Sequence, residues 1–251
     1  MEPIPLRLSI LSGSASLFLP YPERNLKAGQ IDVNRVMKNL FILCLILLFA
    51  PITGLTQSDK TSEVSYLSPL EKAVANEINL ARTSPKEYLS LLEQFKKYYD
   101  GKLLKLPGET PILTKEGTSA VVEAIRSLRS QKPVSPLSPS KGMSLGAKDH
   151  LGDLRTSGTF QHKGGDGSQT WERVNRYGTW QRTIGENISF GHDKARNIVM
   201  TLIIDDGVTN RGHRKNIINP DFRLVGVACG DHPAYRTICV ITFAGGYREK
   251  D

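Results

Sequence analysis

An unbroken apolar run, Leu40–Ala50, limits which part of this chain can fold as a globular domain. It follows the short basic start Met37-Lys38-Asn39 and precedes a proline, a glycine and small polar residues. This order is typical of a secretory signal peptide, and the run is shorter than the ~20 residues that a membrane-spanning helix needs. We therefore expect residues 37–57 to be a signal peptide, with an uncleaved anchor as the alternative. The mature chain is then expected to be secreted, periplasmic or extracellular, with no transmembrane span.

The residues on either side of this run have different expected roles. Residues 1–36 show no clear periodicity and lie upstream of the better start at Met37, so we interpret them as an extension from a misassigned start codon. Cys44 lies inside the apolar run rather than after it, which argues against a lipid-attachment site. The folded domain is expected at residues 68–247.

The charge of the chain gives only a weak indication of its partners. The net charge is +8, but the basic residues are scattered, with no run of five or six. We interpret this balance as a solvated surface, with attraction to acidic cell-wall polymers or lipid headgroups as the alternative. The aromatic residues do not interleave with basic residues as a base-stacking surface requires, so nucleic acid is not an expected partner.

Apolar residues at helical spacing predict four helices, at about 69–82, 117–131, 141–157 and 194–206. The first begins with the pattern of a capping box at Ser68-Pro69-Leu70-Glu71. For the last, Asp193 is the expected N-cap and Gly207 the expected left-handed residue past its end. In the second, Val121 and Val122 are both expected to be buried.

The segments between and after these helices complete an α+β pattern. Residues 100–116 and 133–139 are rich in Gly or Pro and are interpreted as a loop and a connector. Arg223–Cys229 and Thr237–Ala244 are rich in β-branched and aromatic residues and flank a turn, which predicts a β-hairpin. Helices first and a hairpin last indicate helices packed on a sheet.

Cys229 and Cys239 are the cysteines of the predicted domain. They lie five residues on either side of Ala234, near the centre of the predicted turn, so the hairpin register can place them opposite each other. An exported protein can form such a disulfide, whereas a cytosolic one rarely does.

The polar residues that could carry chemistry are concentrated between positions 160 and 216. Glu186 shares a strand face with two isoleucines, and a carboxylate so placed is costly unless it is paired. Asp205 and Asp206 end the fourth helix, where exposed carbonyl groups make an added anion unfavourable. Arg211, Arg214 or a metal ion could compensate that charge, and a structural ion-pair network is the simpler explanation for Asp206.

These residues fall in motifs that resemble the CAP superfamily of cysteine-rich secretory, antigen 5 and pathogenesis-related 1 proteins, and its bacterial branch above all. The resemblance spans about residues 68–247. The motifs that carry it are Asn79-Leu80-Ala81-Arg82, Ala147-Lys148-Asp149-His150, His162 with Asp166-Gly167-Ser168, Glu172–Gly178, Gly185-Glu186-Asn187-Ile188, Gly212–Ile217 and Val225-Gly226-Val227. The resemblance implies a three-layer α-β-α sandwich.

The same resemblance implies a cleft with two histidines and two acids that can bind a divalent cation, zinc or calcium. His162 and His213 match the histidines and Glu186 the first acid. The family's second acid is a glutamate three residues after a tryptophan, and here Leu202 and Asp205 occupy those two positions. Asn187 and Arg214 belong to the same motifs and are expected to support the cleft.

Three functions are compatible with such a cleft. The leading one is a non-enzymatic binding or interaction module for a lipid, a cell-envelope polymer or a protein. The rival is a metal-assisted hydrolase of peptide or cell-envelope substrates with Glu186 as general base, and the third is a degenerate cleft on a structural domain. The sequence lacks the G-x-S-x-G, H-E-x-x-H, P-loop and G-x-G-x-x-G motifs of common enzyme classes.

Overall fold

The structure, a computed structural model, describes residues 64–157 and 161–250. The predicted extension at 1–36 and the predicted signal peptide at 37–57 lie outside the described residues. The described residues belong to one compact unit, Lys60–Asp251. Within the described residues, no helix is long and apolar enough to cross a membrane.

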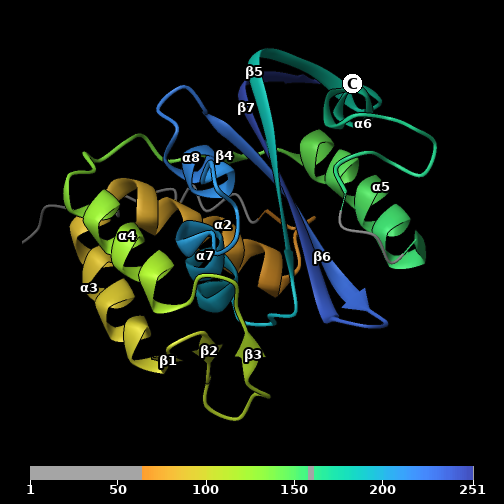
Figure 1. Ribbon diagram of the computed structural model, residues 1–251. Helices are drawn as coiled ribbons and strands as arrows, with labels where there is room; N and C mark the ends of the chain where they lie inside the picture. Colours follow the sequence, from red (N-terminus) through yellow and green to blue (C-terminus); the bar gives the residue numbers. More distant parts are fainter. Residues whose placement is uncertain (1–63, 158–160, 251) are drawn as a thin grey trace, which may run out of the picture. The chain divides into compact units, whose positions relative to one another are not determined.

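A four-stranded sheet lies between two layers of helices (Figure 1). Its strands, in spatial order, are β4 (Ser138–Pro139), β6 (Leu224–His232), β7 (Arg236–Glu249) and β5 (Gly178–Phe190). One layer consists of α5 (Lys141–Ser157) and α6 (Thr170–Asn175). The other consists of α2 (Pro69–Thr83), α3 (Pro85–Phe95), α4 (Thr118–Arg129), α7 (Ala195–Ile204) and α8 (Gly212–Ile218). The expected three-layer α-β-α sandwich is therefore confirmed.

A second, three-stranded sheet follows the short helix η1 (Lys96–Tyr98) within the segment that the sequence indicated as loop. It contains β1 (Tyr99–Asp100), β2 (Leu103–Leu104) and β3 (Ile112–Leu113), and both of its pairings are antiparallel. Strands of two residues are too short to produce a periodic pattern, which is why the sequence did not predict them.

The four predicted helices are present, and the capping box that begins the first is confirmed. The Ser68 backbone N–H donates to Glu71 Oε2 (2.7 Å) and the Glu71 N–H donates to Ser68 Oγ (3.3 Å). Helix α3 was missed because it starts directly after α2, with Ser84 ending one helix and preceding the other. The missed helices α6 and α8 have six and seven residues, too few for a periodic signal.

Three local predictions were wrong. The N-cap of α7 is Lys194, without a side-chain cap, and Asp193 instead lies 3.5 Å from the Arg236 guanidinium. The left-handed residue that ends α7 is Asp205 (φ 58°), two positions before the left-handed Gly207. Val122 is exposed because it lies on the outer face of α4, whereas Val121 is buried.

Close approach of α5 to the sheet depends on a glycine in β6. A Cβ atom at Gly226 would collide with the backbone of Met143 in α5. Apolar residues of α5, among them Ala147, Leu151 and Leu154, then pack against Ala228 and residues of β7. The larger part of the core lies on the other face of the sheet, between it and α2, α4 and α7.

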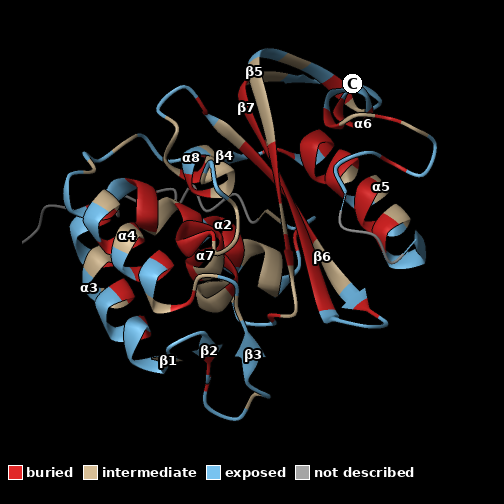
Figure 2. Cartoon of the chain, in the orientation of Figure 1, coloured by how far each residue is buried: buried red, intermediate tan, exposed pale blue. Residues whose placement is uncertain are grey.

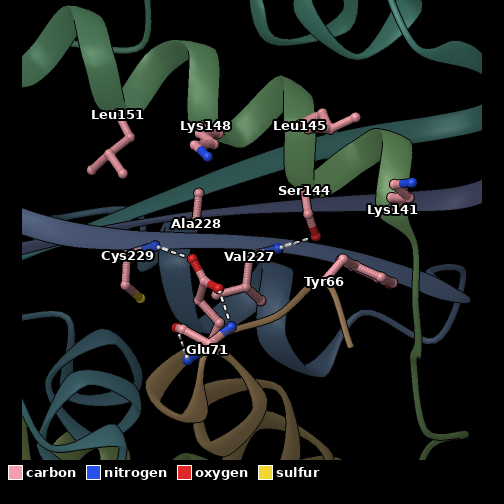
Figure 3. Close-up of a pocket in the computed structure, with 11 residues that line it drawn as sticks. Tyr66, Glu71, Lys141, Ser144, Leu145, Lys148, Leu151, Val227, Ala228 and Cys229 are labelled. Carbon is pink, nitrogen blue, oxygen red and sulfur yellow. Dashed lines mark hydrogen bonds between the residues drawn. The ribbon is translucent and has the colours of Figure 1, made fainter. Parts of the chain in front are cut away.

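Side chains from two helices close the open edge of β6 (Figure 3). The Val227 N–H donates to Ser144 Oγ of α5 (3.0 Å), and the Cys229 N–H donates to Glu71 Oε1 of α2 (2.9 Å). These four residues line a pocket of about 320 Å³ between α5 and the start of α2. Unpaired N–H groups at a sheet edge invite pairing with another chain, and these two are already satisfied.

Cys229 and Cys239 lie directly opposite each other in the β6–β7 pairing and form a disulfide. Reduction of this bond is expected to lower the free energy of unfolding by about 2–3 kcal/mol, because the cross-link restricts the unfolded chain. Urea denaturation with and without reductant measures the change. The double variant Cys229→Ala/Cys239→Ala is the control, since its curve should not respond to reductant. An unchanged wild-type curve with both thiols titratable would contradict this expectation.

Candidate functional site

The edge strand β5 presents its polar residues to the two layers of the fold alternately. Glu186 and Asn187 are consecutive, so their side chains point to opposite faces. Glu186 faces α6, where Arg173 Nη2 donates to its Oε2 (2.8 Å). Asn187 Nδ2 donates to the backbone oxygen of His213 at α8 (3.0 Å). The strand thus contacts both parts of the candidate site.

Glu186 and His162 form the first histidine–acid pair. His162 Nδ1 lies 2.9 Å from Glu186 Oε1, and His162 is about half exposed while Glu186 is buried. Arg173 is only 1% exposed and also donates to the backbone oxygens of His162 (3.1 Å) and Ser168 (2.8 Å), so it fixes the loop that carries His162. Burial alone would raise the pKa of Glu186, but the His162 hydrogen bond and the Arg173 charge together hold it below its usual range.

Asp205 and His213 form the second pair, at the junction of α7 and α8. His213 Nδ1 lies 2.7 Å from Asp205 Oδ1. Asp205 Oδ2 accepts the backbone N–H groups of His213 (2.9 Å) and Arg214 (3.3 Å), the first residues of α8. The buried Asp205 therefore ends α7 and caps α8, where the free N–H groups of the helix favour an anion.

The arginines at this junction bind the end of α7 through its carbonyl groups rather than through the carboxylates of Asp205 and Asp206. Arg211 Nη1 donates to the Asp205 oxygen (2.8 Å) and Arg214 Nε to the Ile203 oxygen (2.6 Å). Asp206 has a structural role, as its carboxylate accepts three backbone N–H groups just before α4. The expected charge compensation is thus present, but it acts on the carbonyl oxygens of α7.

Two glutamates outside the predicted site hold these arginines in place. Arg214 donates to both oxygens of Glu123 (2.8 and 2.6 Å), and Arg211 donates to both oxygens of Glu116 (2.6 and 2.7 Å). Together with the Gly207 N–H, Arg211 lowers the pKa of Glu116 to about 2. The predicted supporting residue Arg214 is buried and joins α8 to α4 and α7.

The four predicted residues lie in two pairs in the structure. Among residues 64–157 and 161–250, no group of three or more His, Cys, Asp or Glu side chains is close enough to hold a metal ion. A pocket of about 190 Å³ is lined by Asp205 and His213 together with Ser189, Phe190 and His192, and His162 and Glu186 are not part of its lining. Binding of one cation by all four residues stays a prediction.

The pairing also determines how each imidazole ring is oriented. An ionised carboxylate only accepts hydrogen bonds, so Nδ1 of His162 and of His213 is the donor nitrogen, and in a neutral ring Nε2 then has the lone pair. Histidines that bind metals usually donate their other ring N–H to a carboxylate in this way. In this geometry Glu186 and Asp205 orient the rings rather than offer free oxygens.

Sequence reasoning missed Arg173 and His150, which surround Glu186. His150 is fully buried, its Nε2 lies 2.8 Å from the Gln161 oxygen, and burial lowers its pKa despite the nearby Glu186. Both residues lie within the motifs that resemble the family. Nothing in the spacing, however, indicated that they would meet a carboxylate from β5.

Comparison with known proteins shows which family this domain is similar to. Residues 122–243 match the model of the cysteine-rich secretory protein family, CAP, a range that begins after α2 and α3. The uncharacterized protein YkwD of Bacillus subtilis (strain 168) is 28% identical over 107 residues, which are 43% of this chain and 40% of that protein. The match therefore spans less than half of the relative's length.

Solved structures with low overall similarity include two bacterial proteins. An outer surface protein from Borrelia burgdorferi is 18% identical, with a TM-score of 0.38 over 53% of this chain and 89% of that chain. An extracellular protein containing a SCP domain from Bacillus anthracis str. Ames is 20% identical, with a TM-score of 0.35 over 51% of this chain and 37% of that chain. The family match and the Bacillus subtilis relative together support a CAP domain of the bacterial type that includes residues 122–243.

Proposed function

We propose that this protein is an exported binding module whose two histidine–acid pairs bind a divalent cation through imidazole nitrogen. The observation that carries the proposal is that Nδ1 of both His162 and His213 lies within hydrogen-bond distance of a buried carboxylate. Each ring is thereby fixed with Nε2 as the available ligand atom. Neutral imidazole favours zinc over calcium, which prefers oxygen ligands.

The rival function, metal-assisted hydrolysis, requires a general base that can reach a water molecule. Both oxygens of Glu186 are hydrogen-bonded, and its lowered pKa makes it a weak base. Asp205 is likewise engaged by His213 and by the first N–H groups of α8. Because both carboxylates already have hydrogen-bond partners, cation binding is favoured over catalysis as the function of the site.

Export of the chain is part of the same proposal. The signal-peptide pattern at 37–57 and the match to a family of secretory proteins both support it. A disulfide-bonded domain also suits an oxidising compartment outside the cytoplasm. The partner is then a lipid, a cell-envelope polymer or a protein at the cell surface or beyond.

The cation is tested by calorimetric titration of zinc into the processed chain, residues 58–251. We expect His162→Ala and His213→Ala each to weaken zinc binding more than tenfold, because each removes a ligand atom. Glu186→Gln and Asp205→Asn are expected to weaken it by about 10–100-fold, the usual effect of losing the group that orients a ligand. Acidification should also weaken binding, because protonated imidazole cannot coordinate a metal.

The matched control is His232→Asn. His232 is the last residue of β6, where its Nδ1 accepts the N–H groups of Ala234 and Tyr235 in the following turn, and asparagine can make the same kind of local bond. Zinc binding by this variant should equal that of the wild type. If the wild type binds no zinc, or if both alanine variants bind it as tightly as the wild type, the cation proposal is wrong.

A further inference from the structure

We propose that the small sheet β1–β3 and its flanks form a docking surface for anionic lipid membranes. Most of this segment is coloured as exposed in Figure 2. Of the eight exposed large apolar or aromatic side chains among the described residues, four lie between positions 98 and 113. They are Tyr98, Leu103, Ile112 and Leu113. Single exposed apolar residues are ordinary on protein surfaces, whereas a cluster marks an interaction site.

The strand register places two leucines on the same outward face. Leu103 and Leu113 are directly opposite each other in the β2–β3 pairing, so their side chains lie on one face of the sheet. The neighbouring Leu104 and its strand partner Ile112 point the other way, Leu104 being buried in the core and Ile112 remaining 39% exposed. Leu113 is 76% exposed, the largest exposed fraction among these side chains.

Exposed basic residues are frequent in the segment that carries this apolar face. Five exposed lysines lie between positions 96 and 115, against the two acidic residues Asp100 and Glu109. The lysines are Lys96, Lys97, Lys102, Lys105 and Lys115. Lys105 is the one that pairs with an acid of the segment, Asp100, at 2.6 Å. Exposed apolar side chains with exposed lysines close by in the sequence suit the interface of an anionic membrane, with an acyl boundary below negative headgroups.

Backbone contacts hold this surface in a fixed conformation. The Thr114 N–H donates to the Lys102 oxygen (2.8 Å) and the Lys105 N–H donates to the Tyr98 oxygen (2.8 Å). The Asp206 carboxylate accepts the N–H groups of Lys115, Glu116 and Gly117 and so anchors the end of the segment. Because the leucines are already held outward, docking requires little ordering of the chain.

Lipid is favoured over a protein partner because the charge and the apolar groups alternate along the segment. A protein interface usually has an apolar centre depleted in lysine. Here Lys102 directly precedes Leu103, and Lys115 follows Leu113 by two positions. Long lysine side chains can place their ammonium groups at the headgroups while the leucines enter the acyl boundary.

The test is co-sedimentation of the processed chain, residues 58–251, with vesicles of phosphatidylcholine alone or with 30% phosphatidylglycerol. We expect binding to the anionic vesicles that weakens as salt is raised, and much weaker binding to neutral ones. Leu113→Asp should weaken anionic binding by about tenfold or more, from the lost burial of one leucine. Lys97→Glu/Lys102→Glu should weaken it by about fivefold or more for each lysine.

Two control variants introduce the same kinds of substitution outside the docking surface. Val122→Asp alters an exposed apolar residue of α4, and Lys132→Glu an exposed lysine after α4, so neither should affect vesicle binding. Zinc titration of Leu113→Asp separates this proposal from the cation site, since its zinc affinity should be unchanged. The proposal is overturned if Leu113→Asp binds anionic vesicles as the wild type does. It is also overturned if the wild type does not bind the vesicles but self-associates through Leu113, which would make this face a protein interface.

Discussion

Replacing Arg82 by alanine is expected to lower the free energy of unfolding by about 4 kcal/mol. The Arg82 guanidinium is fully buried and donates to four backbone oxygens. These belong to Ser135 (2.9 Å), Ile217 (2.7 Å), Asn219 (2.9 Å) and Phe222 (3.2 Å). Alanine would remove the Arg82 donor from all four oxygens, of which that of Phe222 keeps Arg223 Nη1 as a donor (2.8 Å), and it would create a cavity in the core. Each effect is costly.

The four oxygens belong to segments that are distant from Arg82 in the sequence. Arg82 lies in α2, while its acceptors lie in the 133–139 connector, at the end of α8 and before β6. Burial lowers the pKa of Arg82 to about 10, so the group stays charged at neutral pH. Its four hydrogen bonds therefore hold α2 to the 133–139 connector and to the segment that follows the second histidine–acid pair.

Urea denaturation of three variants tests this role. Arg82→Lys keeps the charge but has one nitrogen, which cannot span four acceptors, so it should recover less than half of the lost stability. Arg126→Ala removes an exposed arginine of α4 and should change the free energy of unfolding by less than about 0.5 kcal/mol. A loss below 1 kcal/mol for Arg82→Ala would show that the segments are held by other contacts.

The four helices that the sequence predicted contain 10 to 17 residues, which is long enough for apolar residues to repeat at helical spacing. Helix α8 could not be predicted in this way, because its N-terminal N–H groups are capped by Asp205 rather than by its own N-cap residue, Arg211. The cap thus depends on a tertiary contact. Arg211 also has a left-handed backbone (φ 53°), which is uncommon for a residue with a long side chain.

The candidate site was predicted by the family resemblance and not by residue spacing. Alternation along the strand indicated that Glu186 needs a partner, and the structure supplies Arg173 and His162 from two other segments. The contact between β5 and α6 arises only when the sheet is assembled. A local sequence pattern therefore revealed the requirement for a partner but not the residue that meets it.

Breaking the buried ion pair of Glu186 and Arg173 is expected to lower the free energy of unfolding about as much as the loss of Arg82 does. Arg173→Met should lower the free energy of unfolding by about 3–5 kcal/mol, because it leaves the buried carboxylate without its main counter-charge. Glu186→Leu should lower the free energy of unfolding by a similar amount, because it leaves the buried Arg173 guanidinium without its carboxylate partner. The double variant removes both charges, so its loss should be at least about 2 kcal/mol smaller than the sum of the single losses.

The pH dependence distinguishes this ion pair from simple packing. The pKa of Glu186 is lowered in the folded state, so its contribution is complete above the unfolded value of about 4.3 and is lost as the pH falls through the lower folded value. The stability difference between the wild type and Glu186→Gln should therefore be constant near neutral pH and shrink below about pH 4. Additive single losses, or a difference that does not change with pH, would mean that the charges of Glu186 and Arg173 do not stabilise each other. In that case the orientation of His162 would depend on loop packing alone, and Arg173→Met would leave zinc affinity unchanged.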